Sequence, residues 1–279
     1  PVGLLALIME RRFLPSNEGA PSQRFDLPSA LLNVLTLGCF FLAVTGFAQG
    51  HAGWWLVLPV LIGVPLGWLF VRRQLTRSMP LLPVDLLRIP IFALSICSSI
   101  SAFTAQMLAM VSIPFYFQHA LGLNAIHTGL LMTPWPLATM FTAPLAGRLL
   151  ERYHAGLLGG IGMLLFAGGL WGLASLPDRP GFALILSWMM LCGAGFGLFQ
   201  SPNNHTIITA APLHRSGGAS GMLSTARLVG QTCGAALVAL MFNLFADNGT
   251  HVALLVASTF AVMAAVVSTL RVSQSARRA

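Results

Sequence analysis

The sequence predicts an all-α, polytopic bundle of membrane-spanning helices, and three observations lead to this fold class. First, 56% of the 279 residues are hydrophobic and only 8% are charged, which excludes a disordered chain and an ordinary soluble domain. Second, residues 91–117 and 128–146 are two apolar runs without a charge, each long enough to cross a hydrocarbon core of about 30 Å. The third observation is the uneven placement of the arginines.

The expected elements follow from the lengths of the apolar runs. Residues 1–12 are too few to cross a bilayer, so we expect them to be the end of a helix that starts upstream. Two linker helices are expected within residues 27–71, a six-helix bundle within residues 91–270, and a basic cytoplasmic tail at residues 271–279. The expected full spans, eight in all, are residues 27–46, 54–71, 91–117, 128–146, 156–176, 182–199, 219–243 and 251–270.

All fifteen basic residues are arginines, and their positions predict the topology. When successive loops are assigned to opposite sides, thirteen arginines fall on one side, Arg179 falls on the other and Arg227 lies inside a span. Positive loops stay in the cytoplasm, so the arginine-rich side and the C-terminus are predicted to be cytoplasmic. The net charge of +8 is thereby a topology signal, and a nucleic-acid partner, which needs a basic soluble face, is not expected.

Metal and cofactor chemistry find no support in the motifs. The four cysteines lie singly in apolar runs, the histidines lie mostly in or near loops without metal-ligand spacing, and no ATP-binding motif is present. The seven acidic residues lie in loops or at span ends, so this sequence offers no intramembrane carboxylate that could carry a proton.

Several segments resemble the major facilitator superfamily, specifically its fourteen-span drug:proton antiporters of the methyl viologen and quaternary-ammonium efflux type. Residues 1–3 resemble the end of that family's Asn-x-Pro-x-Gly pattern. The other segments that carry the resemblance are residues 80–88, 114–134, 193–197, 201–204 and 215–221. The resemblance implies the C-terminal half of a major facilitator fold preceded by two linker helices.

The resemblance also implies a function. It is the proton-coupled export of lipophilic cationic drugs across a bacterial inner membrane, with the proton gradient as the energy source and no cofactor. The proton-binding carboxylates would then lie in an N-terminal half missing from this sequence, and the fragment alone should not transport. Two alternatives stay open: a transporter of a different solute, and a membrane fragment without transport activity.

A gating loop is implied at residues 147–154, which resemble the family's Gly-x-Leu-x-Asp-Arg-x-Gly loop. Gly147, Arg148, Glu151 and Arg152 would form it, with Glu in place of Asp and His154 in place of the last glycine. A plain cytoplasmic turn is the alternative. Arg227 is a further conformational candidate, which either faces the cytoplasmic cavity near Gln231 or extends to the membrane interface.

Substrate contacts are expected from uncharged polar and aromatic groups near the bilayer midplane, because such transporters bind substrate there. Ser95, Ser99, Ala102, Gln106 and Met110 recur at helical spacing. The candidates are Gln106, Met110, Trp135, Trp188, Phe196 and Gln231. Aromatic faces attract cations and methionines adapt to varied ligands; helix-to-helix packing is the alternative for each.

Overall fold

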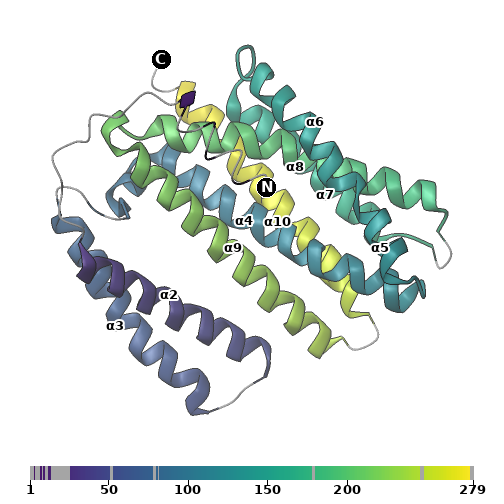
Figure 1. Ribbon diagram of the computed structural model, residues 1–279, viewed down its shortest axis with the longest axis horizontal. Coiled ribbons are helices and arrows are strands. Elements are labelled where there is room, and N and C mark those ends of the chain that lie inside the picture. Colours follow the sequence, from purple (N-terminus) through teal and green to yellow (C-terminus); the bar gives the residue numbers. More distant parts are fainter. Residues whose placement is uncertain are drawn as a thin grey trace.

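The computed structural model describes residues 26–50, 53–77, 80, 82–177, 180–245 and 248–276, with side chains to residue 272, as well as residues 3, 7, 9, 12 and 13. No strand occurs among these residues, and the all-α prediction is confirmed (Figure 1). Most of the predicted helix end at residues 1–12 lies outside the described residues. So do Arg179 and the tail residues 277–279.

The helical elements follow one another with short connections. In chain order they are α2 (Leu27–Ala48), α3 (Trp54–Thr76), η1 (Val84–Arg88), α4 (Pro90–Phe115), η2 (Tyr116–Ala120), α5 (Ala125–Met132), α6 (Pro134–Leu149), α7 (Ala155–Ala174), α8 (Phe182–Ala210), η3 (Leu213–Arg215), α9 (Ser216–Leu244) and α10 (Gly249–Ala276).

Seven helices within the described residues are long and apolar enough to cross a membrane. Their outward faces are apolar as well: Trp54 on α3 is 61% exposed and Leu61 is 64% exposed. Such surfaces are a liability in water, whereas hydrocarbon solvates them without penalty and the helices satisfy their own backbone groups. The chain is a multi-pass membrane protein.

The remaining predicted span, residues 128–146, is divided between α5 and α6 at Thr133. Pro134 and Pro136 have no backbone N–H, so two hydrogen bonds of a continuous helix are missing at this point. Thr133 keeps helical dihedral angles, and its hydroxyl donates to the carbonyl oxygen of Gly129 at 2.9 Å. The division therefore interrupts the helical hydrogen bonds without ending the helical path.

Two predicted helix ends are wrong by several residues. We expected a span to end at Phe199, but α8 continues through Pro202 to Ala210. We also expected Arg271 to begin a basic tail, but α10 continues to Ala276 and Arg271 is only 2% exposed. The polar residues that suggested loops are buried here because they find hydrogen-bond partners on other helices.

A buried polar network explains these extensions. Arg271 donates from Nη1 to the hydroxyl oxygen of Ser95 at 3.0 Å and to Oδ1 of Asn203 at 2.7 Å. Asn203 in turn donates to the hydroxyl oxygen of Ser99 at 2.7 Å, and Ser268 donates to the carbonyl oxygen of Gly156 at 3.0 Å. The network joins α4, α7, α8 and α10 at one end of the bundle.

The helices α4 to α10 form the bundle, and α2 and α3 form a separate hairpin beside α9 (Figure 1). Asp26 pairs with Arg73 at 2.9 Å and with Arg77 at 3.5 Å, closing the hairpin at its charged end. Hydrogen bonds from Ser29 and Arg73 hold the pKa of Asp26 down to about 2. Near the opposite end, Asn243 of α9 donates to the carbonyl oxygen of Ala48 at 2.9 Å.

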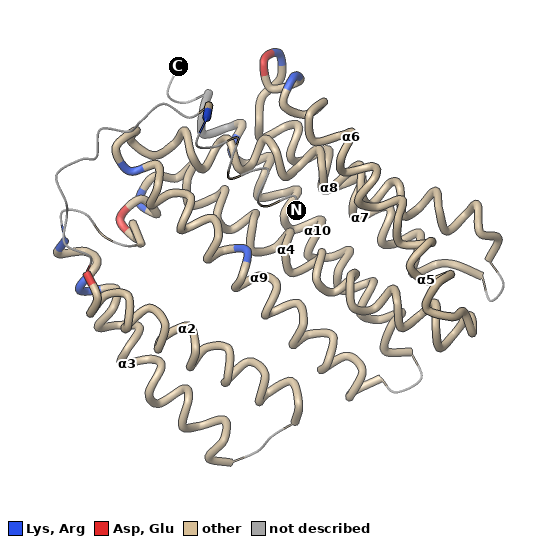
Figure 2. The backbone as a smooth tube through the Cα atoms, in the orientation of Figure 1, with Lys and Arg blue, Asp and Glu red and all other residues tan. Residues whose placement is uncertain are grey.

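Apart from Arg227 within α9, the charged residues of the described part gather at one end of the helices (Figure 2). There Arg215, the last residue of η3, donates two hydrogen bonds of 2.5 and 2.8 Å to the carboxylate of Asp85 in η1. These bonds lower the pKa of the Asp85 carboxyl below its ordinary value. The ion pair joins two of the resembling segments, residues 80–88 just before α4 and residues 215–221 at the start of α9. It therefore holds the first turns of α4 and α9 near one another.

Candidate functional site

An open cleft of about 430 Å³ lies between the helix pair α4–α9 and the helix pair α6–α8. Neither α7 nor α10 contributes to its lining, since both pack on the other side of α4 and α8. The residues that line it are Phe103, Gln106, Met110, Trp135, Pro136, Thr139, Met140, Phe196, Gln200, Arg227 and Gln231.

Aromatic rings form one wall of the cleft. The ring centroids of Phe103 and Phe196 are 5.7 Å apart with an edge-to-face angle of 73°. Behind them, the Phe166 ring stands edge-to-face to Trp135 at 5.3 Å and to Phe196 at 5.6 Å. Such pairs stabilise one another beyond their burial, so this wall is built from fixed rings.

Glycines allow each helix pair to approach closely. A methyl group at Gly230 of α9 would lie 2.6 Å from the carbonyl oxygen of Ile100, and one at Gly234 would lie 2.6 Å from that of Thr104, both on α4. On the other side of the cleft, Gly193 of α8 meets the backbone of Trp135, and the Thr139 hydroxyl donates to the carbonyl oxygen of Gly193 at 2.9 Å. Small residues thereby set the positions of the cleft's walls.

Arg227 provides a positive charge inside the cleft. Its guanidinium carbon lies 4.9 Å from the centroid of the Phe103 ring, a distance that permits a cation–π interaction. Its Nε is buried and has no hydrogen-bond partner among the residues that the structure describes. The ion pairs present in the described part of the chain involve Asp26 and Asp85, and Arg227 takes no part in them.

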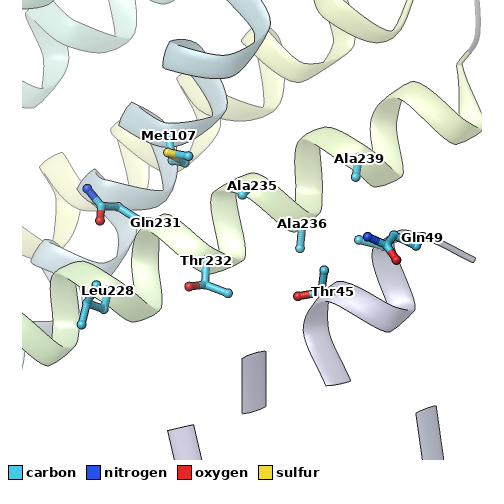
Figure 3. A pocket seen from close by; sticks show the side chains of 10 residues that line it. Thr45, Gln49, Met107, Leu228, Gln231, Thr232, Ala235, Ala236 and Ala239 are labelled. Atoms are coloured by element: carbon cyan, nitrogen blue, oxygen red, sulfur yellow. The ribbon is translucent and has the colours of Figure 1, made fainter. Parts of the chain in front are cut away.

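A second, smaller cavity of about 280 Å³ lies between α9 and the linker helix α2 (Figure 3). Its floor is largely alanine: Ala235, Ala236 and Ala239 of α9 contribute to it, and Thr45 and Gln49 approach from α2. Gln231 lines both cavities, and Met107 of α4 lies next to it in the smaller one. Gln231 therefore stands on the boundary between the central cleft and the groove beneath the linker hairpin.

Residues 94–278, which include every residue that lines the cleft, match the sequence profile of the Major Facilitator Superfamily. The chain belongs to the Major Facilitator Superfamily. Its helical fold and apolar exterior agree with membership of this superfamily of membrane transporters.

Relatives within the superfamily differ in what their names say they transport. The chain is 60% identical to the uncharacterised transporter YebQ of Escherichia coli (strain K12), in an alignment that covers 100% of this chain and 61% of YebQ. It is 30% identical to the multidrug resistance protein Stp of Mycobacterium tuberculosis, covering 85% of this chain and 44% of Stp. It is 25% identical to the riboflavin transporter RibZ of Clostridioides difficile (strain 630), covering 87% and 52%. The chain thus spans less than two thirds of each of these relatives.

The structure brings most of the predicted contact residues of this superfamily member into one place. Gln106, Met110, Trp135, Phe196 and Gln231 all line the central cleft, together with Arg227. Arg227 lines this cleft together with Gln231, and its conformational role stays a prediction. That these residues bind substrate stays a prediction.

Two sets of predicted residues lie elsewhere. Trp188 is not among the residues that line the cleft, because its indole packs over Gly172 of α7. Of the serines expected on the same face as Gln106, Ser95 and Ser99 are fully buried in the Arg271 network. The polar face of α4 therefore divides into a structural part near one end and a cleft part further along.

The loop predicted to gate the transporter ends α6 and precedes α7. Gly147, Arg148, Glu151 and Arg152 are all exposed, and residues 150–154 of the loop line a shallow cavity of about 400 Å³ together with His205 of α8. Glu151 forms no ion pair within the described part of the chain. Its gating role stays a prediction.

Sequence reasoning missed other residues of the cleft, which are Phe103, Pro136, Thr139, Met140 and Gln200. Helical spacing could have found three of them, because side chains three or four residues apart share a face. Phe103 precedes Gln106 by three positions, Thr139 follows Trp135 by four, and Gln200 follows Phe196 by four.

Proposed function

We propose that this chain forms one wall of the substrate cavity of a proton-driven exporter of lipophilic drugs, with lipophilic cations among its substrates. The open central cleft carries the proposal: fixed aromatic rings stand beside three glutamines, a mixture suited to amphiphilic ligands. The name of Stp as a multidrug resistance protein supports the drug class.

The other wall of the cavity would come from a second half of the protein. Transporters with repeated halves bind substrate between them and rock one half against the other. This chain spans 61% of YebQ, which leaves room for such a half in the relative. The carboxylates for proton coupling belong there in this proposal, because the acidic residues that the structure describes, Asp26, Asp85 and Glu151, do not line the cleft.

In the same proposal the protein lies in a bacterial inner membrane with the charged end of Figure 2 toward the cytoplasm. Cysteines introduced singly at Arg77, at Arg215 and next to Asp178 test this orientation. Only the Asp178 site should react with an impermeant reagent added from outside. If a cysteine at position 77 or 215 reacted and the cysteine next to Asp178 did not, the proposed orientation would be wrong.

Transport is tested with the complete gene product in proteoliposomes that carry a proton gradient. We expect gradient-dependent movement of a lipophilic cationic dye, which collapses with an uncoupler and is absent when the 279-residue chain is reconstituted alone. Gln106→Ala, in the cleft, should weaken dye binding about threefold or more, as expected for one lost hydrogen bond. Gln118→Ala, an exposed glutamine just beyond α4, is the matched control and should change it less than twofold.

Transport of a different solute is the second candidate, favoured by the relative named as a riboflavin transporter. A screen of dyes, drugs and flavins in the same proteoliposomes separates the two candidates. Movement of a flavin without movement of any drug would replace the drug proposal. Activity of the 279-residue chain alone would contradict the expectation that a second half is required.

A further inference from the structure

Among the described residues that line the central cleft, the charged side chain is positive. Arg227 lines the cleft, and none of the described acidic residues does. Two of those acidic residues, Asp26 and Asp85, are already paired with arginines at the charged end of the helices. Arg227 lies eleven residues into α9, about 16 Å along the helix axis, which separates it from that end.

Side chains that can donate hydrogen bonds line the same cleft as this charge. The buried Nε of Arg227 has no hydrogen-bond partner in the described part of the chain, and Gln106, Gln200 and Gln231 line the same cleft from α4, α8 and α9. An unmet buried donor is unfavourable, and a guanidinium binds a carboxylate through two parallel hydrogen bonds better than any other side chain does. The arrangement is complementary to an oxygen anion.

The aromatic wall adds the second half of the recognition. The Phe103 ring lies beneath the guanidinium, and its edge-to-face contact with Phe196 continues the apolar surface toward Trp135. A flat aromatic ligand would lie against these rings while its acidic group reached Arg227. A lipophilic cation without an acidic group would instead meet a like charge at this point.

We infer that Arg227 binds the carboxylate of aromatic substrates, so that this site takes zwitterionic or anionic aromatic compounds in preference to their purely cationic forms. The inference rests on the proposed function of the cleft as a substrate site and specifies the substrate class. It places any positive group of a zwitterion on the open side of the cleft, away from α9.

Rhodamine B and its ethyl ester provide the test, because they share one aromatic system and differ in a free carboxylate. Binding of both dyes to the purified complete gene product is measured by fluorescence anisotropy, and transport by proteoliposome flux. We expect the acid to bind more tightly than the ester. Arg227→Gln should weaken binding of the acid at least tenfold, which corresponds to about 1.4 kcal/mol, and change binding of the ester less than twofold.

Two further variants separate recognition from folding. Arg227→Lys keeps the positive charge and should retain most of the preference for the acid that Arg227→Gln loses. Arg88→Gln removes an exposed arginine of η1 outside the cleft and should change the binding of neither dye. Equal weakening of both dyes by Arg227→Gln, or tighter binding of the ester by the unaltered protein, would overturn the inference. Failure of the proposed function is distinct: neither dye would then move with the proton gradient, while the binding comparison would still decide the role of Arg227.

Discussion

Replacing Asn203 by alanine tests the buried network that joins four helices of the bundle. Asn203 is 1% exposed and connects Arg271 of α10 to Ser99 of α4 through two hydrogen bonds of 2.7 Å. Its neighbour Asn204 offers a matched control on the same helix, because the side-chain oxygen of Asn204 is buried without a hydrogen-bond partner.

The expected cost follows from the two bonds that the substitution removes. The hydrogen bond from the charged guanidinium contributes about 1.5–3 kcal/mol. The Asn203–Ser99 bond contributes about 0.6 kcal/mol, the average for such bonds in a helical membrane protein. Asn203→Ala should therefore lower the free energy of unfolding by about 2–3.5 kcal/mol. Asn204→Ala should change it by less than about 0.5 kcal/mol, because the oxygen it removes accepts no hydrogen bond from the described residues.

Detergent-induced unfolding of the purified protein, followed by far-ultraviolet circular dichroism in mixed micelles, measures both variants under the same conditions. A loss for Asn203→Ala no larger than that for Asn204→Ala would refute the reasoning, since the two substitutions delete the same atoms one residue apart. A double variant with Ser99→Ala extends the test. Its cost should be less than the sum of the single costs, because both substitutions remove the same bond.

The remaining predictions concern the charged end and the walls of the cleft. In a double-mutant cycle, Asp85→Asn and Arg215→Gln should show a coupling of about 0.5–1 kcal/mol, since the pair is partly exposed. Because the pKa of Asp85 is lowered in the folded state, its contribution to stability is complete above its ordinary value of 3.8 and is lost as the pH falls through the lowered pKa; an unchanged acid-unfolding profile in Asp85→Asn would contradict this. Gly230→Ala should destabilise the protein by about 1–3 kcal/mol, because the methyl group would lie 2.6 Å from the carbonyl oxygen of Ile100 and push α9 away from α4. Gly221→Ala on the same helix meets open space and should be neutral or slightly stabilising; a similar loss at both glycines would rule out the close approach as the cause.

The sequence alone was sufficient for the fold class and for much of the cleft. Long uncharged runs predict membrane helices because hydrocarbon leaves few alternatives for the backbone. Polar and aromatic residues at helical spacing, such as Gln106 with Met110, predict a shared face, and both residues line the cleft. The same spacing could not distinguish which helix covers that face, so Trp188 was placed with the ligand contacts although it packs on Gly172.

By itself, the sequence determined the properties that depend on residues near one another in the chain. These are the helices, their apolar exteriors and the grouping of arginines. Only the tertiary structure decided which polar residues serve packing and which line a cavity. Arg271 illustrates the reason, because its partners Ser95 and Asn203 are 176 and 68 residues away in the chain and no local pattern contains them. Arg227 has the same side chain and ends at the cleft, since the helices packed around it place a phenylalanine ring and open space where Arg271 meets hydrogen-bond acceptors.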